Sequence, residues 1–323
     1  MDVTTELTGA FPRSEALVTA TRDLDRGRTT PEAVEELYRS AEREVVQLES
    51  RLGLSPATGG YLRWADLFRP IAETWSGFTV GPVTRWFETN TFFRQPILTA
   101  PPERVAGALN RWFPGGGDGN HGASWKVFLP GPFTFARMLD NRSGETPEAL
   151  THRLGRLLAD EVRELRAKGY RAFQFQEPLL VVEPPEGAAA EAVVAAYEAL
   201  QPALDGAKSI VWTYFGDPGP VAGLLRRLPV AVVGFDLAEA DLEHLPDFGP
   251  HRGLGFGCID PRTTLVEDAG ELVSVVRSVS SRLKPSSVLL GPGAGLDLLP
   301  WEPATRKLHT LPAARQLLLQ EAK

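Results

Sequence analysis

The stretch TPEALTHRLGRLLADEVRELRAKGYRAFQFQEP, residues 146–178, contains one predicted helix and one predicted strand, and it decides the fold class. Thr146 is a favourable N-cap, Pro147 suits the first helical position, and Gly169 marks the end of a segment with helical periodicity. The apolar run after Gly169 is short and rich in phenylalanine, which is typical of a buried strand. The stretch therefore predicts a helix that leads directly into a strand.

The same alternation extends over the rest of the chain. A second helix is predicted from Thr30 as N-cap, with Pro31 at its first position and Gly53 just beyond its end. The predicted strands cover residues 7–12, 57–64, 124–131, 171–178, 209–215, 230–237, 253–260 and 286–293. Eight such β–α units predict an α/β protein, a single closed (β/α)₈ TIM barrel that spans residues 1–323.

One segment departs from the alternation. The sequence TVGPVTRWFETNTFFRQPIL, residues 79–98, has enough β-branched and aromatic residues to predict a β-hairpin. The reacting groups of a barrel lie at the C-terminal ends of its strands and in the loops that follow. We expect the hairpin to lie over this C-terminal mouth.

Composition excludes several classes of protein. A chain of 323 residues with 43% hydrophobic content can form a sizeable core, and the sequence has neither a signal-peptide pattern nor an apolar run of membrane-spanning length. A cytoplasmic protein without membrane contact is therefore expected. The formal net charge of −7 argues against nucleic acid as a partner. The single cysteine, Cys258, excludes a multi-thiolate metal cluster, and none of the five histidines pairs at a spacing typical of a zinc site.

The predicted strand ends carry few nucleophiles but several acidic and aromatic residues. Glu177, Asp236 and Asp260 could provide a general acid–base pair, or they could cap loops and pair with arginines. Tyr214, beside them, is a further catalytic candidate. Because Cys258 lies inside the apolar run GLGFGCID, we expect it to be a buried, inert thiol.

Cations and flat rings near the same ends could bind a ligand. Together the cations could hold an anionic small molecule, or they could be solvated loop residues; they are Arg13, Arg63, Arg85, Arg94 and Lys126. Trp86, Trp212 and Tyr214 could receive a heteroaromatic ring, or they could fill the barrel core.

Several motifs follow one another along nearly the whole chain: GAFPRSEAL, GGYLRWADL, VTRWFETNTFFRQPIL, LPGPFTFARML, FQFQEPLLV, WTYFGD, GFDL, GCIDPRTTLVED and GPGAGLDLLPWEPATRKL. In type and order they resemble cobalamin-independent methionine synthase. The resemblance implies two fused barrels in that family, of which the C-terminal one binds zinc, homocysteine and methyltetrahydrofolate. The present chain is long enough for one barrel only.

The resemblance also implies where zinc ligands would lie. In the family's catalytic half, a His-x-Cys pair, a glutamate and a second cysteine hold the metal; here the matching positions are Trp212, Tyr214, Asp236 and Ala294. One carboxylate cannot replace three or four zinc ligands, so we expect no metal and no other cofactor. The homocysteine positions of the catalytic half hold Ala10, Tyr61 and Gln176 here. TRWFETN and TYFGD resemble the family's N-terminal, zinc-free half instead.

Three functions follow from the resemblance. The chain could be a non-catalytic N-terminal-type barrel that assists a separate zinc-bearing barrel in methyl transfer from methyltetrahydrofolate to homocysteine. It could be an independent zinc-free methyltransferase or small-molecule enzyme that uses Glu177, Asp236 and Tyr214. It could also bind a folate- or pterin-like ligand without chemistry. Candidate ligand-binding residues are Arg13, Arg63, Trp86, Arg94, Lys126 and Trp212.

Overall fold

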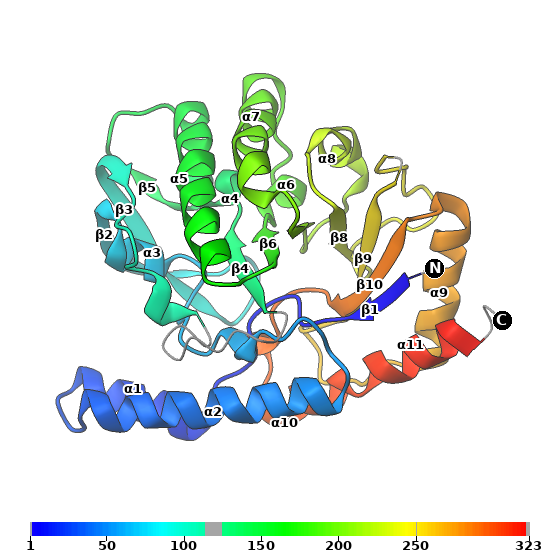
Figure 1. The fold of residues 1–323 in the computed structure, drawn as a ribbon, viewed down its shortest axis with the longest axis horizontal. Coiled ribbons are helices and arrows are strands. Elements are labelled where there is room, and N and C mark those ends of the chain that lie inside the picture. Colours follow the sequence, from blue (N-terminus) through cyan, green and yellow to red (C-terminus); the bar gives the residue numbers. More distant parts are fainter. Residues whose placement is uncertain (1, 114–124, 250, 321–323) are drawn as a thin grey trace.

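The computed structural model describes residues 2–113, 125–249 and 251–320, in which helices and strands alternate (Figure 1). The strands are β1 (Asp2–Thr5), β2 (Ser76–Arg85), β3 (Phe92–Glu103), β4 (Lys126–Pro130), β5 (Asp140–Asn141), β6 (Ala172–Gln176), β7 (Lys208–Trp212), β8 (Val232–Asp236), β9 (Gly253–Ile259) and β10 (Ser287–Pro292). The helices are α1 (Glu15–Asp25), α2 (Pro31–Arg51), α3 (Arg69–Thr74), α4 (Pro132–Met138), α5 (Pro147–Ala167), α6 (Leu179–Val182), α7 (Gly187–Leu204), α8 (Ala222–Arg227), α9 (Ala269–Leu283), α10 (Trp301–Leu308) and α11 (Thr310–Gln320).

Within the described residues, seven strands form one parallel sheet in the order β1-β10-β9-β8-β7-β6-β4. The sheet is curved, and helices α5, α7, α8 and α9 lie along its outer side (Figure 1). The predicted α/β class is confirmed, and six of the predicted strands correspond to β4, β6, β7, β8, β9 and β10. The predicted helix starts are also confirmed, because the side chains of Thr30 and Thr146 cap α2 and α5.

Two predicted strands are wrong. The first strand is β1 at Asp2–Thr5, where Val3, Thr4 and Thr5 supply the β-branched residues, and residues 7–12 form the loop that follows it. Residues 57–64 form only an isolated bridge from Ala57 to Trp125 and a short 3₁₀ turn. The two glycines of this segment have positive φ angles, which a strand does not accommodate.

An irregular segment nevertheless lies between the two edges of the sheet. The Ser55 N–H donates to the Thr5 carbonyl beside β1 at 2.9 Å, and the Lys126 N–H of β4 donates to the Ala57 carbonyl at 2.9 Å. The Tyr61 hydroxyl donates to the Phe128 carbonyl at 2.9 Å and also accepts the Phe128 N–H. A tyrosine side chain thus takes backbone hydrogen bonds of β4 that a neighbouring strand would otherwise make.

The predicted hairpin is confirmed. Strands β2 and β3 pair in antiparallel fashion from Ser76 with Glu103 to Arg85 with Phe92, and β5 adds to β3 as a short parallel strand. Residues of the hairpin end, including Trp86 and Phe92, line the same pocket as Gln176 at the end of β6. The hairpin therefore covers the carboxyl ends of the parallel strands, as expected.

Trp212, the last residue of β7, fills the concave side of the sheet. Its indole N–H donates to the Gly293 carbonyl at 2.8 Å, and its side chain is fully buried. A Cβ atom on Gly234 would lie 1.9 Å from the indole, and one on Gly255 would lie 2.4 Å from it. Only glycine at these two positions leaves room for the tryptophan.

The same interior contains an ion pair. Lys126, at the beginning of β4, donates to Glu6 at 2.9 Å, and both side chains are fully buried. Lys208, at the beginning of β7, also bonds Glu6. The cluster lies toward the amino-terminal ends of β4 and β7, away from the hairpin end.

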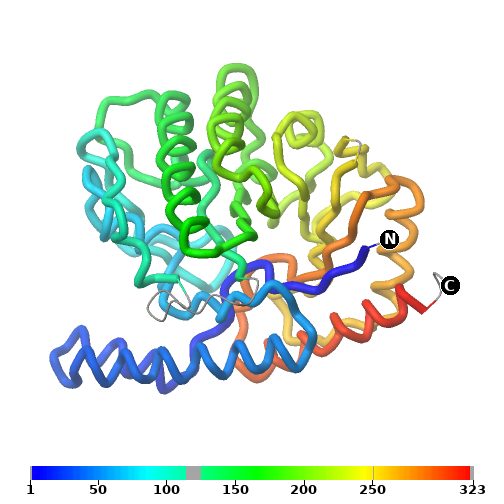
Figure 2. Tube along the Cα trace, in the orientation of Figure 1, coloured from blue at the N-terminus to red at the C-terminus, as the bar shows by residue number. Residues whose placement is uncertain are grey.

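The two ends of the described chain lie beside each other. Helix α11 packs against β1, and Arg315 in α11 donates to the Val3 carbonyl at 2.8 Å (Figure 2). Helices α1 and α2 form a pair that extends away from the curved sheet (Figure 2). In the part of the chain that the structure describes, no helix has the length and apolar character needed to span a bilayer.

Candidate functional site

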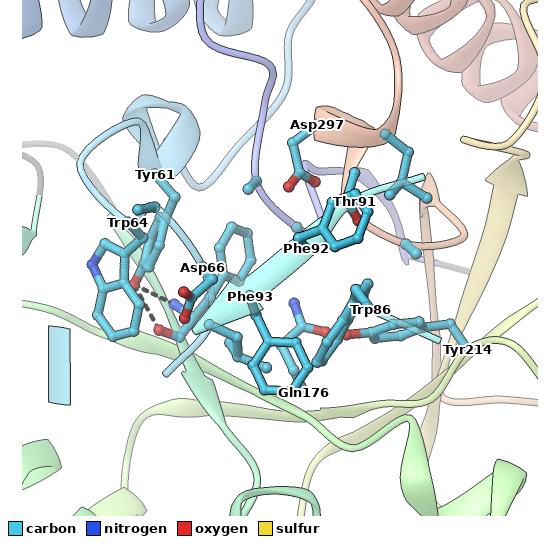
Figure 3. Close-up of a pocket in the computed structure, with 18 of the residues that line it drawn as sticks. Tyr61, Trp64, Asp66, Trp86, Thr91, Phe92, Phe93, Gln176, Tyr214 and Asp297 are labelled. Atoms are coloured by element: carbon cyan, nitrogen blue, oxygen red, sulfur yellow. Dashed lines mark hydrogen bonds between the residues drawn. The ribbon is translucent and has the colours of Figure 1, made fainter. Parts of the chain in front are cut away.

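A pocket lies at the carboxyl ends of the parallel strands, below the hairpin, and encloses a cavity of about 100 Å³. Eight of its nineteen lining residues are aromatic, with a few polar residues among them (Figure 3). Its lining comprises Gly9, Ala10, Tyr61, Trp64, Ala65, Asp66, Leu67, Trp86, Thr91, Phe92, Phe93, Phe128, Gln176, Tyr214, Phe215, Ala294, Gly295, Asp297 and Leu298. Concave, largely apolar sites with a few polar groups are typical of small-molecule binding.

The pocket unites the strand ends that the sequence placed at one mouth. Ala10, Tyr61, Gln176, Tyr214 and Ala294 all line it. Each of these positions matches a zinc or homocysteine position in the sequence comparison above. Of the seven positions matched by motif, these five line one pocket, and Trp212 and Asp236 do not.

Gln176 is a buried polar group of the pocket, at the end of β6. Its side chain is 5% exposed, and its Nε2 donates to the Thr8 carbonyl at 2.8 Å. The side-chain oxygen of Gln176 has no hydrogen-bond partner within the described residues. Buried acceptors are normally paired, so this oxygen is available to a donor that enters the pocket.

Asp297 supplies a carboxylate to the pocket, opposite Gln176 in the view of Figure 3. Surrounding protein atoms raise the pKa of this carboxyl to about 6, and nearby Arg13 opposes the rise. Solvent still reaches the side chain through the mouth, which limits that desolvation. Asp297 is therefore ionised at neutral pH.

Asp66 is a second carboxylate in the wall, but it is already occupied. Its oxygens accept the backbone N–H groups of Phe68 at 2.9 Å, Arg69 at 2.7 Å and Arg94 at 2.9 Å. These bonds fix the start of α3 and attach the hairpin to it. Asp66 is consequently a structural clamp at the pocket rather than a free acceptor.

Of the residues predicted for the site, only Trp86 and Tyr214 line the pocket. Trp86 packs edge-on against Phe93 with ring centroids 5.5 Å apart. Burial raises the pKa of Tyr214 well above its usual value, so its hydroxyl stays protonated at neutral pH. Trp212 is absent from the lining, because its ring fills the interior below the pocket.

Glu177 lies beside the pocket but points away from it. Its carboxylate accepts the Phe133 N–H at 3.1 Å, the Thr134 N–H at 2.8 Å and the Tyr197 hydroxyl at 3.2 Å, and the side chain is fully buried. Burial raises the pKa of Glu177 to about 7 despite these bonds. The predicted catalytic acid is thus a cap for the first turn of α4.

Replacing Glu177 with alanine is expected to lower the free energy of unfolding by about 2 kcal/mol at pH 5, because two helix N–H groups lose their buried acceptor. The folded pKa of about 7 lies above the ordinary glutamate value of 4.5, so the stability contributed by Glu177 falls as pH rises between these values. Denaturant titrations from pH 5 to pH 8 measure both effects. An equal loss in Glu186→Ala, whose side chain makes no cap hydrogen bond, would contradict the capping role.

Asp236 and Asp260 also lie outside the pocket lining. Asp236 is fully buried, accepts the Ala238 N–H at 3.1 Å and has one oxygen 3.9 Å from Arg262. Arg262 bonds Asp260 at 2.9 Å and also pairs with Glu239. Burial raises the pKa of Asp236 to about 6. The carboxylates pair with an arginine, which was the alternative to an acid–base role.

The predicted cations do not gather around one ligand. Arg63 is taken by Glu35 and Glu42, each at 2.7 Å. Lys126 is wrongly placed at the mouth by the prediction, because it begins β4 and is paired with Glu6 inside the sheet. The remaining three cations also lie outside the pocket lining. Arg13 lies near Asp297, Arg85 donates to the Thr89 carbonyl at 2.7 Å, and the exposed Arg94 side chain donates to the Gly81 carbonyl at 3.4 Å.

The positions that match zinc ligands do not fit that metal. Trp212 offers an indole N–H, which cannot coordinate a cation, and it is occupied by Gly293. Ala294 has no donor atom, and Tyr214 and Asp236 do not share the pocket lining. The described residues contain no group of three or more His, Cys, Asp or Glu side chains that could hold a metal ion. Cys258 is buried and its thiol faces the Phe256 carbonyl, as expected for an inert cysteine.

Sequence reasoning missed Asp297 and the aromatic residues Trp64, Phe92 and Phe93. Asp297 lies in a 3₁₀ turn just after β10, so the rule that sites form after parallel strands could have identified it. The aromatic residues come from the hairpin and from the loop before α3. The hairpin was expected over the mouth, but no local sequence signal tells which of its aromatic side chains face the cavity.

Comparisons with known proteins identify the family and the fold of this chain. Residues 74–284 match the family model described as cobalamin-independent synthase, N-terminal domain. The methionine synthase of Saccharolobus solfataricus is 26% identical over 325 residues, covering 99% of this chain and 96% of that protein. The methionine synthase of Sulfurisphaera tokodaii is 24% identical over 323 residues, covering 99% and 93%. A B12-independent methionine synthase from a Shewanella species, solved with selenomethionine, has a similar fold, with a TM-score of 0.77, 16% identity and coverage of 99% and 98%.

Proposed function

Because this chain belongs to the cobalamin-independent synthase family, we propose that it is a barrel of the N-terminal type that assists methionine synthesis without transferring the methyl group itself. The partner in this proposal is a separate barrel that carries zinc. The proposal combines the family match with the residue types at the carboxyl ends of the strands.

Trp212 is the observation that carries the non-catalytic proposal. It stands where the family resemblance implies a histidine ligand, and its ring is fixed between Gly234, Gly255 and Gly293. The tryptophan at the ligand position is therefore packed tightly against the surrounding strands. Bound zinc would lower the pKa of a substrate thiol, and the described residues contain no cluster of side chains that could hold the metal.

An independent zinc-free enzyme receives less support. Its proposed acid, Glu177, spends both carboxylate oxygens on α4 and Tyr197, and Asp236 is paired with Arg262 outside the pocket. A general acid or base must reach its substrate directly or through one water. Of the three proposed catalytic residues, only Tyr214 lines the cavity, and its raised pKa keeps the hydroxyl protonated, so it is not available as a base at neutral pH.

We also propose that the curved sheet is closed into a barrel. The segment between β1 and β4 bonds both edges through Ser55 and Ala57. We infer that it stands in for the missing strand, so that the seven-stranded sheet and this segment together enclose a barrel-like interior. The curved sheet in Figure 1 and the TM-score of 0.77 to a methionine synthase support this closure.

The functional proposal predicts no methionine formation by the purified chain alone. The assay contains methyltetrahydrofolate, homocysteine and either this chain, a zinc-bearing methionine synthase barrel from the same organism, or both. We expect the mixture to be faster than the zinc-bearing barrel alone, with an unrelated barrel protein at equal concentration as the control. Methionine made by this chain in the presence of a chelator would contradict the non-catalytic role, and a mixture no faster than the partner alone would contradict the assistance.

A further inference from the structure

The pocket presents hydrogen-bond acceptors and ring faces, and the described residues that line it include no arginine, lysine or histidine. An anion in this cavity would therefore meet carboxylate and carbonyl oxygens without a compensating cation in the wall. Aromatic faces, by contrast, attract cations through their quadrupole. Trp64, Trp86 and Tyr214 provide such faces around the cavity (Figure 3).

The side-chain oxygen of Gln176 can be satisfied only by a hydrogen-bond donor, not by a cation that lacks an N–H or O–H group. Its amide N–H group is committed to the Thr8 carbonyl, which fixes the orientation of the amide and leaves the oxygen as the free end. The neighbouring Gln174 also donates to Thr8, at 2.6 Å, so the Thr8 carbonyl holds both amides in place. A ligand N–H directed at the Gln176 oxygen would satisfy this buried acceptor.

Asp297 supplies the charge that a cationic ligand needs. Unlike Asp66, whose carboxylate accepts three N–H groups from other residues, the Asp297 carboxylate is influenced only by the N–H of its own residue among the backbone donors of the described chain. That N–H also donates to the Ala10 carbonyl at 3.2 Å. Arg13 is the cation that acts on it, from outside the lining, and Tyr214 is the titratable neighbour inside. The carboxylate thus lies in the pocket wall, where a cationic ligand would meet it.

We propose that this pocket binds a small organic amine in its ammonium form, with N–H donors toward Gln176, charge compensation by Asp297 and an apolar group against the aromatic wall. A cavity of about 100 Å³ limits the ligand to a few non-hydrogen atoms, since one water needs roughly 10–15 Å³ of such space. This inference concerns the chain alone and holds whether or not it assists a second barrel.

The test compares four probes of similar size by ligand-observed NMR titration of the purified chain. We expect saturable binding of isobutylammonium. Isobutanol lacks the charge, 2-methylpropanoate has the opposite charge, and tetramethylammonium has the charge without an N–H donor. Each of these three is expected to bind at least about tenfold more weakly, the scale of one charge-assisted hydrogen bond. Equal or tighter binding of the carboxylate, or no saturable binding of isobutylammonium, would overturn the proposal.

Two variants locate the binding. Asp297→Asn is expected to weaken isobutylammonium about tenfold, whereas Asp160→Asn, the same change on the exposed face of α5, leaves the affinity unchanged. Gln176→Met removes the acceptor and is expected to abolish the preference for isobutylammonium over tetramethylammonium. Unchanged binding by Asp297→Asn, or an equal loss in Asp160→Asn, would place the amine elsewhere and refute the assignment. Because binding is measured without catalysis, its failure is separate from a failure of the methionine assay.

Discussion

Lys126→Met is expected to lower the free energy of unfolding by about 3 kcal/mol or more, because it leaves Glu6 as a buried carboxylate with a weakened set of partners. Glu6 and Lys126 are both fully buried and 2.9 Å apart. Burial raises the pKa of Glu6, but attraction by Lys126 and Lys208 outweighs burial and lowers it overall. Removing the nearer lysine removes most of that compensation.

The matched control is Lys168→Met, which removes a half-buried lysine 3.8 Å from Glu164. Surface pairs of this kind contribute about 0–1 kcal/mol, so this variant should remain close to the wild type. The double variant Glu6→Gln with Lys126→Met should lose less stability than the sum of the single changes, since neither charge is then left alone. Denaturant unfolding measures the free energy of unfolding of the wild type, the two single variants, the double variant and Lys168→Met. Equal losses from Lys126→Met and Lys168→Met would contradict the buried-pair argument.

The pH dependence of the same pair has a defined sign. The folded pKa of Glu6 lies below the ordinary glutamate value of 4.5, so ionised Glu6 stabilises the folded state above that pH. As pH falls below 4.5 and through the folded pKa, this stabilisation is lost. The loss should be smaller in Lys126→Met, because the ionised Glu6 carboxylate is stabilised less when Lys126 is absent.

Gly234→Ala is expected to cost about 3 kcal/mol, at the upper end of the range for overpacked cores, because its new methyl group would lie 1.9 Å from the Trp212 ring. The ring cannot move away easily. Its N–H is bonded to Gly293 at 2.8 Å, and its far edge lies against Gly255. The sheet itself would therefore have to shift.

Gly223→Ala is the matched control, since no atom lies within 4 Å of its new methyl group and the position is inside α8. This change should be neutral or stabilising by up to about 1 kcal/mol, as expected from helix propensity. Trp212→Leu combined with Gly234→Ala should recover part of the loss caused by Gly234→Ala, with a coupling of at least about 1 kcal/mol in unfolding experiments. Strict additivity of the two changes would show that the methyl group and the indole do not compete for the same space.

The sequence predicted most of the sheet because its signals are local. Apolar runs bounded by helix caps at Thr30 and Thr146 identified six strands and the two capped helices. The segment at 57–64 defeated the same reasoning, because it carries strand-like residues but two of its glycines have positive φ angles. Instead of a strand backbone, the segment offers the Tyr61 hydroxyl to the backbone of Phe128 in β4. No local sequence pattern reports this long-range contact.

The candidate site was predicted in position more than in content. Motif order placed Ala10, Gln176, Tyr214 and Ala294 at one mouth, and they do line one pocket. The direction of each side chain was beyond the sequence. Glu177 follows Gln176 directly, but successive residues of a strand point to opposite faces, so Gln176 faces the cavity and Glu177 caps α4.

The amino-acid sequence alone established the alternation of strands and helices, the family resemblance and the loss of the expected ligand side chains, because all three depend on residue identity and chain order. Which charges are free was decided by tertiary packing. Arg63 and Lys126 are equally good candidates in a linear sequence, yet each already has carboxylate partners in the folded protein. The loop after β10 places Asp297 in the pocket wall, where Arg13 is its nearby cation but lies outside the lining. Such pairing is determined by distances between residues remote in sequence, and only the folded chain fixes those distances.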